Sequence, residues 1–337
     1  MEKYSQFRDR GSGIAPFFPV PAQPSGVYLP IHIFLFICRV PLLIVVSVTY
    51  TVLCSWLPVG SLVKKAGLWI LLGVPGVWWI DLQIDGVKRG SLAKHRNRLP
   101  QPGTIIASSF TSPIDCLYLA AIFDPIFTAS YPSTRLVHRI SLLQAILRAL
   151  LPPQATPPPS ARLVPLSTLL KEHPDSAIVV QPECTATNGR GILPFSPCLL
   201  TAPRETKIFP VSLRYTAADI TTPVPGAYLS FLWNLCSAPT HTIRVRIAEA
   251  AYNTAGDSSS KRRPKTQTQA LDDLLHSINS DDTIVEDGDE SPSPDEQKVL
   301  DKVEEDLARL GRVKRVGLGA ADKLEFVKAW TRRRKVL

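Results

Sequence analysis

Residues 177–191 read Ala-Ile-Val-Val-Gln-Pro-Glu-Cys-Thr-Ala-Thr-Asn-Gly-Arg-Gly, an apolar, β-rich run that ends at Gln181 and continues as a polar segment. A short apolar run of this kind predicts a buried strand. The Asn188-Gly189 pair predicts a tight turn that can present backbone N–H groups, because glycine adopts conformations closed to other residues. Arg190 beside it can grip a phosphate with two parallel hydrogen bonds. The segment therefore reads either as a phosphate-binding loop or as a plain surface loop with an Asn-Gly turn.

Outward from this segment, short β-rich runs alternate with apolar helical stretches from about Trp79 to Ala250. Strand–helix–strand repetition predicts an α/β fold with a mixed, largely parallel sheet covered by helices. We expect strands at Ile80–Ile84, Thr104–Ala107, Ile126–Ala129, Ala177–Val180, Lys207–Leu213 and Thr242–Ile247. We expect helices at Pro113–Phe123, Leu136–Leu150 and Val164–Glu172.

The region before residue 81 is strongly apolar. No residue from Val40 to Val63 is charged, and a second uncharged run covers 66–80. The first run supplies the roughly 20 apolar residues that cross a bilayer, whereas the second is shorter and contains Pro75-Gly76. Residues 27–80 are therefore expected to be a membrane anchor, either a helical hairpin or one span plus an interfacial segment. A pair of buried core helices is the alternative, but tryptophans near the run ends favour a membrane. The apolar run begins too late for a cleaved signal peptide.

Charge and cysteine usage narrow the class of partner. The net charge is +9, although residues 281–296 contain eight acidic and no basic residues. Basic residues border the anchor and the C-terminus, where they attract anionic lipid headgroups; no nucleic-acid-binding motif accompanies them. The six cysteines lack metal-ligand spacing, so we expect reduced thiols and no metal. The predicted organisation is a polar leader (1–26), the anchor (27–80), the α/β domain (81–250), a disordered acidic Ser/Pro-rich insertion (251–297) and C-terminal helices with a basic tail (298–337).

Three segments follow one another along the α/β region: Ser108 to Asp115 at a strand-to-helix junction, Val180 to Gly191, and Lys207 to Arg214 with its Pro210-Val211 pair. Their order and spacing resemble the glycerophospholipid acyltransferase family, which includes the lysophosphatidic acid acyltransferases. That family carries an N-H-x-x-x-x-D block, an F-P-E-G-T block and an apolar-Pro-Val block. The resemblance covers roughly residues 74–250, and both chain ends are similar to a fungal branch of the family. It implies an acyltransferase-like domain resting on the N-terminal hydrophobic hairpin.

The resemblance implies a reaction in which a histidine takes a proton from a glycerol hydroxyl, while an aspartate five residues later orients the imidazole. Asp115 matches the aspartate, but Phe110 stands at the histidine position and cannot accept a proton. Asp115 acting directly, or a histidine from elsewhere such as His138, could substitute. Residues 112–115 (Ser-Pro-Ile-Asp) read equally well as a helix start, with Asp115 at the third helical position bonding the exposed N–H groups.

The resemblance also marks an acceptor-binding segment, with Glu183, Thr185, Asn188, Gly189 and Arg190 as the candidate substrate-binding residues. Cys184 stands where the family has glycine, and we expect an inert thiol because no basic partner is near it in sequence. Arg162 is a weak match to a further family arginine, and Arg214 reads as a solvated strand residue. The expected helix 136–150 could line an acyl-chain groove or be a buried core helix; its polar exceptions are Arg135, His138, Arg139 and Arg148.

The resemblance implies acyl-CoA-dependent conversion of lysophosphatidic acid to phosphatidic acid in phospholipid and triacylglycerol synthesis. It implies acyl-CoA as a cosubstrate, no bound cofactor, and contact with anionic membrane phospholipids. The implied location is the endoplasmic reticulum membrane and the lipid droplet surface, with the catalytic domain facing the cytosol. Two alternatives stay open: a degenerate acyltransferase fold acting as a lipid-binding or vacuolar-sorting adaptor, which Phe110 favours, and another lysophospholipid as acceptor.

Overall fold

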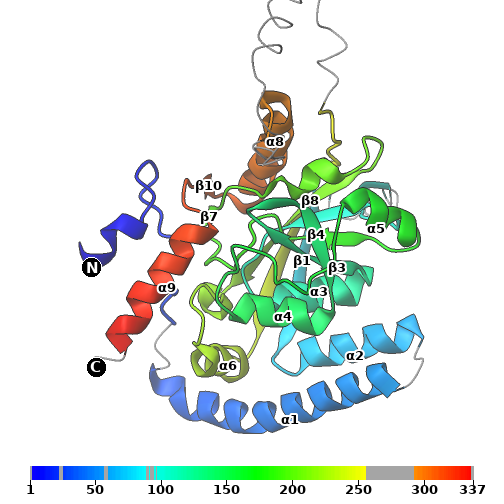
Figure 1. Cartoon of the computed structure of the whole chain (residues 1–337). Coiled ribbons are helices and arrows are strands. Elements are labelled where there is room, and N and C mark those ends of the chain that lie inside the picture. Colours follow the sequence, from blue (N-terminus) through cyan, green and yellow to red (C-terminus); the bar gives the residue numbers. More distant parts are fainter. Residues whose placement is uncertain are drawn as a thin grey trace, which may run out of the picture.

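The computed structural model describes residues 2–22, 26–56, 60–88, 91, 95, 97–255 and 292–334. Its centre is an eight-stranded sheet in the order β1-β9-β8-β2-β6-β3-β4-β5 (Figure 1). Neighbours pair in parallel at β1/β9, β8/β2, β2/β6 and β6/β3, and antiparallel at the other three junctions. The α/β fold with a mixed, largely parallel sheet is confirmed. The strands are β1 (Val77–Ile84), β2 (Ile105–Ser108), β3 (Ile126–Tyr131), β4 (Thr134–Ile140), β5 (Leu163–Val164), β6 (Ile178–Val180), β8 (Ile208–Thr216) and β9 (His241–Ile247).

Helices cover both faces of the sheet, as continuous Ile/Val runs in the central strands require. One apolar core joins the sheet to α2 (Ser61–Gly73), α3 (Pro113–Phe123), α4 (Leu142–Leu150) and α6 (Tyr228–Ser237). A second core lies on the other face, under α5 (Leu166–Glu172) and α8 (Pro294–Gly311). The carboxyl ends of β2 and β6 lead into the first and second family-like segments, so the fold brings both segments to one edge of the sheet.

The helix expected over 136–150 is wrong in its first half. Residues 134–140 form β4, which pairs with β3 as an antiparallel hairpin, and α4 begins only at Leu142. The boundary follows from Ser141, whose hydroxyl accepts the Gln144 N–H while the Gln144 side chain accepts the Ser141 N–H. Such a reciprocal cap fixes a helix start, and apolar content alone did not separate strand from helix upstream of it.

The N-terminal leader, expected to be polar, packs onto the C-terminal helix α9 (Ala320–Arg334). Tyr4, Phe7 and Phe17 are buried in one cluster with Phe326 of α9. Their rings meet that of Phe326 at centroid distances of 5.3–6.1 Å. These contacts lie in the preferred range for aromatic pairs and bring the two ends of the described chain side by side (Figure 1). Most of the expected disordered insertion, 256–291, lies outside the described residues.

The expected anchor contains α1 (Leu29–Trp56) and α2, which lie against each other below the sheet (Figure 1). Residues Gly26–Val52 are long and apolar enough to cross a membrane, by length and composition alone. The outer face of α1 exposes large apolar side chains, among them Phe34, Ile37, Ile44 and Val45. Its inner face contacts the domain, with the Phe36 ring 5.1 Å from that of Trp233 on α6.

Candidate active site

Asp115 lies fully buried in the first turn of α3. Its Oδ2 accepts the backbone N–H groups of Thr111 (2.7 Å) and Ser112 (2.9 Å) and the Thr111 hydroxyl (3.0 Å). Its Oδ1 accepts the hydroxyl of Tyr215 from β8. Burial raises the Asp115 pKa to about 6, and these hydrogen bonds oppose the rise by stabilising the carboxylate. The helix-start interpretation of residues 112–115 therefore describes the geometry, with Tyr215 as an added partner.

Phe110, at the position of the family histidine, is buried against Ala149 and Ala186. Its backbone N–H donates to Glu183 Oε1 at 3.3 Å, and its carbonyl accepts the Thr187 N–H at 2.9 Å. The Phe110 backbone thus joins the first and second family-like segments by two hydrogen bonds. Its side chain offers no proton acceptor. The hydrogen bond to Asp115 Oδ1 comes from the Tyr215 hydroxyl and not from an imidazole.

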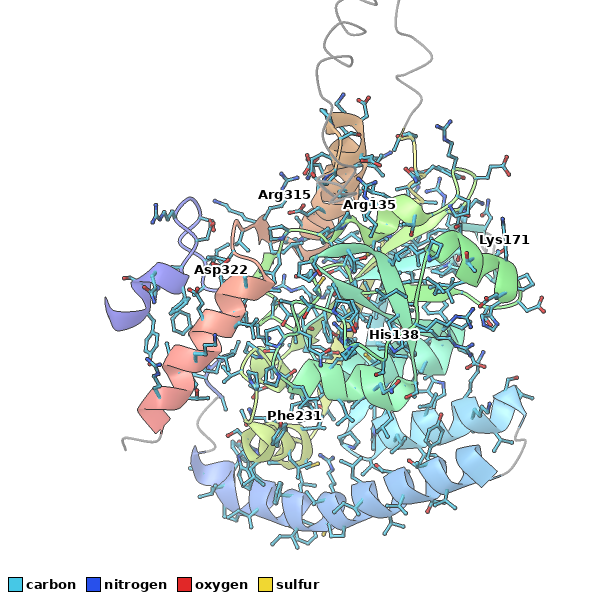
Figure 2. All side chains as sticks on the ribbon, in the orientation of Figure 1. Arg135, His138, Lys171, Phe231, Arg315 and Asp322 are labelled. Carbon is cyan, nitrogen blue, oxygen red and sulfur yellow. The ribbon has the colours of Figure 1, made fainter. Side chains whose placement is uncertain are left out.

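His138 does not replace the missing histidine. It projects from β4, where its ring Nδ1 donates to the Arg162 carbonyl at 3.1 Å (Figure 2). Within the described ranges, the hydrogen-bond partners of Asp115 are Thr111, Ser112 and Tyr215. The site therefore holds an oriented carboxylate without the base that the resemblance implies.

Glu183, predicted as a substrate ligand, is buried inside the segment that follows β6. Its Oε1 accepts from Phe110, and its Oε2 accepts the Leu193 N–H at 3.2 Å. Burial raises the Glu183 pKa to about 8, against the lowering effect of these two bonds. The carboxylate braces the loop from within instead of facing a cavity.

The other residues of this segment are largely structural as well. Asn188 donates through Nδ2 to the carbonyls of Ala15 (2.8 Å) and Phe18 (2.9 Å), which ties the N-terminal leader to the loop. Thr185 is buried, whereas Arg190 is exposed. Gly189 has φ +69°, and a Cβ there would approach Thr111 Cγ2 at 3.4 Å, so the turn requires glycine.

Cys184 keeps the backbone conformation that the family glycine would allow, with φ +60°. A non-glycine residue in that region carries local strain that the surrounding packing must hold. Burial raises the pKa of its thiol, which favours the protonated, unreactive form expected from sequence. The five described cysteines are free: Cys38, Cys116, Cys184, Cys198 and Cys236.

Two other candidate arginines lie outside the site. Arg214 is exposed on β8 and donates to the carbonyl of Gly311 at the end of α8. Arg162 is exposed and lies 3.8 Å from the Glu172 carboxylate. The described ranges contain no group of three or more His, Cys, Asp or Glu side chains that could hold a metal ion.

Arg148 on α4 is the basic residue that the fold brings to the carboxyl edge of the sheet. Its Nη2 donates to the Ser130 carbonyl (3.1 Å) at the end of β3, and its guanidinium lies 4.9 Å from the centre of the Tyr131 ring. Its Nη1 is enclosed and has no hydrogen-bond partner among the described residues. Burial lowers the Arg148 pKa, and the neighbouring Tyr131 side chain is the largest of the effects that oppose this fall. In the sequence, Arg148 was one of four polar exceptions on the expected helix 136–150, and only the fold separates it from the other three.

An apolar cavity of about 490 Å³ opens between the anchor helices and the α/β domain. Volumes of roughly 300–1,000 Å³ are typical of ligand sites. The cavity reaches Pro113 and Ile114, the residues directly before Asp115, and Leu117 one turn further along α3. Its remaining walls are Leu43, Ser47, Tyr50, Thr51, Leu71, Leu72, Pro75, Val77, Ser141, Leu142, Leu143, Ile146, Leu150, Phe231 and Leu235.

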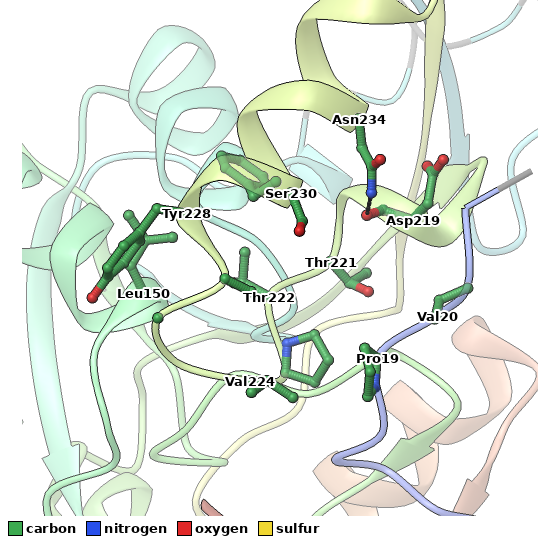
Figure 3. A pocket seen from close by; sticks show the side chains of 14 residues that line it. Pro19, Val20, Leu150, Asp219, Thr221, Thr222, Val224, Tyr228, Ser230 and Asn234 are labelled. Atoms are coloured by element: carbon green, nitrogen blue, oxygen red, sulfur yellow. Dashed lines mark hydrogen bonds between the residues drawn. The ribbon is translucent and has the colours of Figure 1, made fainter. Parts of the chain in front are cut away.

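A smaller, more polar pocket of about 80 Å³ adjoins this cavity, because Leu150 and Phe231 line both hollows (Figure 3). Its polar lining includes Asp219, whose carbonyl accepts from Asn234 at 2.9 Å. The pocket also includes Thr222, whose N–H donates to the Thr111 carbonyl. The apolar cavity and a smaller pocket with some polar lining therefore adjoin beside the first family-like segment.

Comparison with known proteins finds similarity to lysophosphatidic acid acyltransferases. It is 27% identical over 337 residues, covering 98% of both chains, to a Schizosaccharomyces pombe protein named putative lysophosphatidic acid:oleoyl-CoA acyltransferase. It is 27% identical over 201 residues to Lysophosphatidic acid:oleoyl-CoA acyltransferase 1 of Saccharomyces cerevisiae, covering 58% of this chain and 61% of that protein. A search of solved structures finds the 1-acyl-sn-glycerophosphate acyltransferase PlsC of Thermotoga maritima at 12% identity and a TM-score of 0.35, covering 76% of this chain and 98% of that one. No family model matches the chain. The full-length relative confirms the resemblance seen in the sequence and supports acyl transfer as the activity.

Proposed function

We propose that this chain, a relative of the lysophosphatidic acid acyltransferases, transfers an acyl group from acyl-CoA to lysophosphatidic acid and releases phosphatidic acid. The observation that carries the proposal is the apolar cavity of about 490 Å³, which runs from the anchor helices to the first turn of α3 beside Asp115. A lipid tail in this cavity would bring its polar end to the edge of the sheet where the family-like segments meet. Both curated relatives bear names that specify lysophosphatidic acid as acceptor and oleoyl-CoA as donor.

The placement of α1 supports binding from one membrane leaflet. Arg39, in the middle of this apolar helix, donates through Nη1 to the Ala238 carbonyl (2.5 Å) and through Nη2 to that of Pro239 (2.9 Å). Longer contacts reach the carbonyls of Pro75 (3.3 Å) and Cys236 (3.4 Å). The helix is thereby held along the domain with its apolar face outward, so the hairpin lies in the membrane surface and the cavity opens at lipid depth.

Arg148 is the group that we assign to the acceptor phosphate. A buried guanidinium without an anionic partner is costly, and a phosphate oxygen would satisfy its unpaired Nη1. Ligands of α/β proteins bind at the carboxyl ends of the strands, and the contact of Arg148 with the carbonyl of Ser130 lies at that edge.

The chemistry then proceeds without a histidine base. The acceptor hydroxyl oxygen forms a bond to the thioester carbon, the carbon–sulfur bond breaks, and the hydroxyl proton leaves to solvent or to the departing thiolate. General-base catalysis contributes about 10²–10⁴-fold, whereas positioning of two substrates supplies roughly 7–11 kcal/mol of the barrier. A slow transferase that relies on positioning is therefore physically consistent with Phe110. We propose a cytosol-facing role in phospholipid and triacylglycerol synthesis at the endoplasmic reticulum and lipid droplets.

A cavity-filling substitution tests the proposal. Ile146→Trp places an indole in the cavity, whereas Leu147→Trp on the next position of α4 is the matched control, because Leu147 is exposed and does not line the cavity. Purified protein in nanodiscs would be assayed with labelled oleoyl-CoA and lysophosphatidic acid. We expect Ile146→Trp to lose at least about 10-fold in turnover and Leu147→Trp to retain it. Equal turnover in the two variants would contradict the assignment of the cavity to substrate.

The adaptor remains a second candidate, favoured by the burial of Phe110 and by the full set of partners on Asp115. The same nanodisc assay separates the two functions. Saturable binding of lysophosphatidic acid, with product formation no faster than in protein-free vesicles, would identify a lipid-binding adaptor.

A further inference from the structure

The C-terminal part of the chain pairs with the residues that directly follow the acceptor-binding segment, residues 183–190, which are expected from the sequence to bind the acceptor. Gly191–Ile192 form strand β7, which pairs in parallel with β10 (Lys314–Arg315). The Val316 N–H continues the ladder to the Ile192 carbonyl at 3.0 Å. A Cβ on Gly191 would lie 2.8 Å from Val316 Cγ1, so β7 and the segment after β10 approach each other as closely as glycine permits. Arg315, labelled in Figure 2, lies on β10 beside α8. It pairs with Asp301 of α8 at 3.3 Å.

A second contact comes from α9 and reaches the middle of the acceptor-binding segment. Lys323 is only 1% exposed, and its Nζ donates to the Ala186 carbonyl at 2.5 Å. The helix that carries it begins at a cap in which the Gly319 N–H donates to Asp322 at 2.7 Å. One turn further along α9, Phe326 is fully buried in the aromatic cluster of the leader. Lys323 is therefore inserted by a helix that is fixed on both sides of it.

The charge of Lys323 has a counterpart in the same loop. Burial lowers the Lys323 pKa to about 7, and the charge of Glu183 opposes this shift. Both carboxylate oxygens of Glu183 accept backbone N–H groups, one from Phe110 in the segment before α3 and one from Leu193 directly after β7. A lone buried ammonium costs several kcal/mol, so its placement beside Glu183 and the Ala186 carbonyl couples the loop conformation to α9.

We propose that Lys323 is a positioning residue. It holds residues 183–190, whose Cys184 contacts Ser130 next to Arg148, in the conformation that the acceptor site requires, and so makes acceptor binding depend on the C-terminal helix. The proposal rests on the proposed function for its kinetic consequence. A preorganised loop loses less conformational entropy on binding, so loosening it weakens acceptor affinity more than turnover.

Kinetics on the full chain test this consequence. In Lys323→Met the apolar stem remains but the donor is lost. A hydrogen bond made by a charged group corresponds to about 10-fold or more in affinity, so we expect the KM for lysophosphatidic acid to rise about 10-fold with kcat changed less. Lys323→Gln, which keeps a donor, should recover part of the affinity and serves if the methionine variant does not fold. Lys328→Met, an exposed position on the same helix, should match wild type. An unchanged KM in folded Lys323→Met protein overturns the proposal.

Hydrogen exchange supplies a readout that needs no activity. The amides of Thr187, Asn188 and Leu193 should exchange about 10-fold faster in Lys323→Met than in Lys328→Met, while those of β2 and β6 keep their rates. Phe326→Leu is the packing variant: it should speed exchange in α9 and the leader and, because it loosens the helix that carries Lys323, raise the KM by less than Lys323→Met does. Unaltered exchange at residues 187–193 refutes the positioning role even if the wild-type protein transfers no acyl group. An inactive wild type with faster loop exchange would refute the proposed function alone.

Discussion

Arg39→Met asks whether α1 lies along the domain or crosses the bilayer, because the two arrangements predict effects of opposite sign. In the structure the Arg39 guanidinium contacts four carbonyls at 2.5–3.4 Å, three of them at the end of α6. Removing a charged donor from such a set costs about 1.5–3 kcal/mol. The favourable interaction of a cation with a helix C-terminus adds about 0.3–1 kcal/mol. We therefore expect Arg39→Met to lower the free energy of unfolding by about 2–4 kcal/mol.

If α1 instead crossed the membrane, Arg39 would lie in hydrocarbon. Removing a charge from the centre of a spanning helix favours insertion by about 2.5–3.5 kcal/mol. The substitution would then strengthen membrane integration instead of weakening the fold.

Thermal unfolding in detergent measures the first quantity. At roughly 2–4 °C per kcal/mol for domains of this size class, the expected fall in Tm is about 4–16 °C. Lys65→Met on α2 is the control for loss of a positive charge near the membrane, and it should leave Tm within about 1 °C. An N-terminal glycosylation tag supplies a second readout. Glycosylation of the tag in cells, together with an unchanged or raised Tm in Arg39→Met, would refute the docked hairpin.

Three further substitutions test the site. Tyr215→Phe removes a hydroxyl that lowers the Asp115 pKa, which burial raises to about 6 from 3.8, so the folded state loses stability as pH rises from about 4 to 6 and the variant should lose more. In denaturant titrations, the variant's loss of unfolding free energy relative to wild type should be larger at pH 7.5 than at pH 5. A loss that does not depend on pH would contradict the hydrogen bond between Tyr215 and Asp115. Arg148→Gln should weaken binding of lysophosphatidic acid at least about 10-fold in vesicle flotation. Arg139→Gln, at an exposed position of β4, should not weaken it. Equal binding by the two variants would show that Arg148 does not hold the phosphate. Gly189→Ala, at φ +69° beside Thr111, should lower stability by about 1–2 kcal/mol, and a neutral result would show that the turn adapts.

The sequence carried much of the fold and the order of its parts. The span of α3 agrees with expectation to the residue, because Ser112, Pro113 and Asp115 encode a helix start within four positions. Strands β1, β2, β3, β6, β8 and β9 were placed to within a few residues, since continuous apolar runs bounded by turn residues carry a strong signal. The half-strand, half-helix character of 134–150 was missed, because residues 134–140 mix apolar and polar side chains without strict alternation and the helix cap at Ser141 is a weak local signal.

Local sequence pattern did not predict the hydrogen-bond partners of the candidate site residues. Sequence motifs marked Glu183 and Asn188 as ligands of substrate, whereas in the structure their polar groups are used on Phe110, Leu193 and the leader. The hydrogen-bond partner of a side chain is a property of packing, and these partners lie 10 to 173 residues away along the chain.

By itself, the sequence determined the α/β class, the apolar N-terminal helix and the phenylalanine at the position of the family histidine, because periodicity, apolar content and residue identity are local properties. The tertiary structure alone decided that Tyr215 completes the shell of Asp115, that Arg148 reaches the sheet edge, and that Lys323 enters the loop 137 residues before it. These contacts join residues that lie 18 to 137 positions apart, well beyond the period of two to four residues by which a helix or strand shows in a sequence. They exist because the sheet order and the aromatic cluster of the two chain ends bring those elements together.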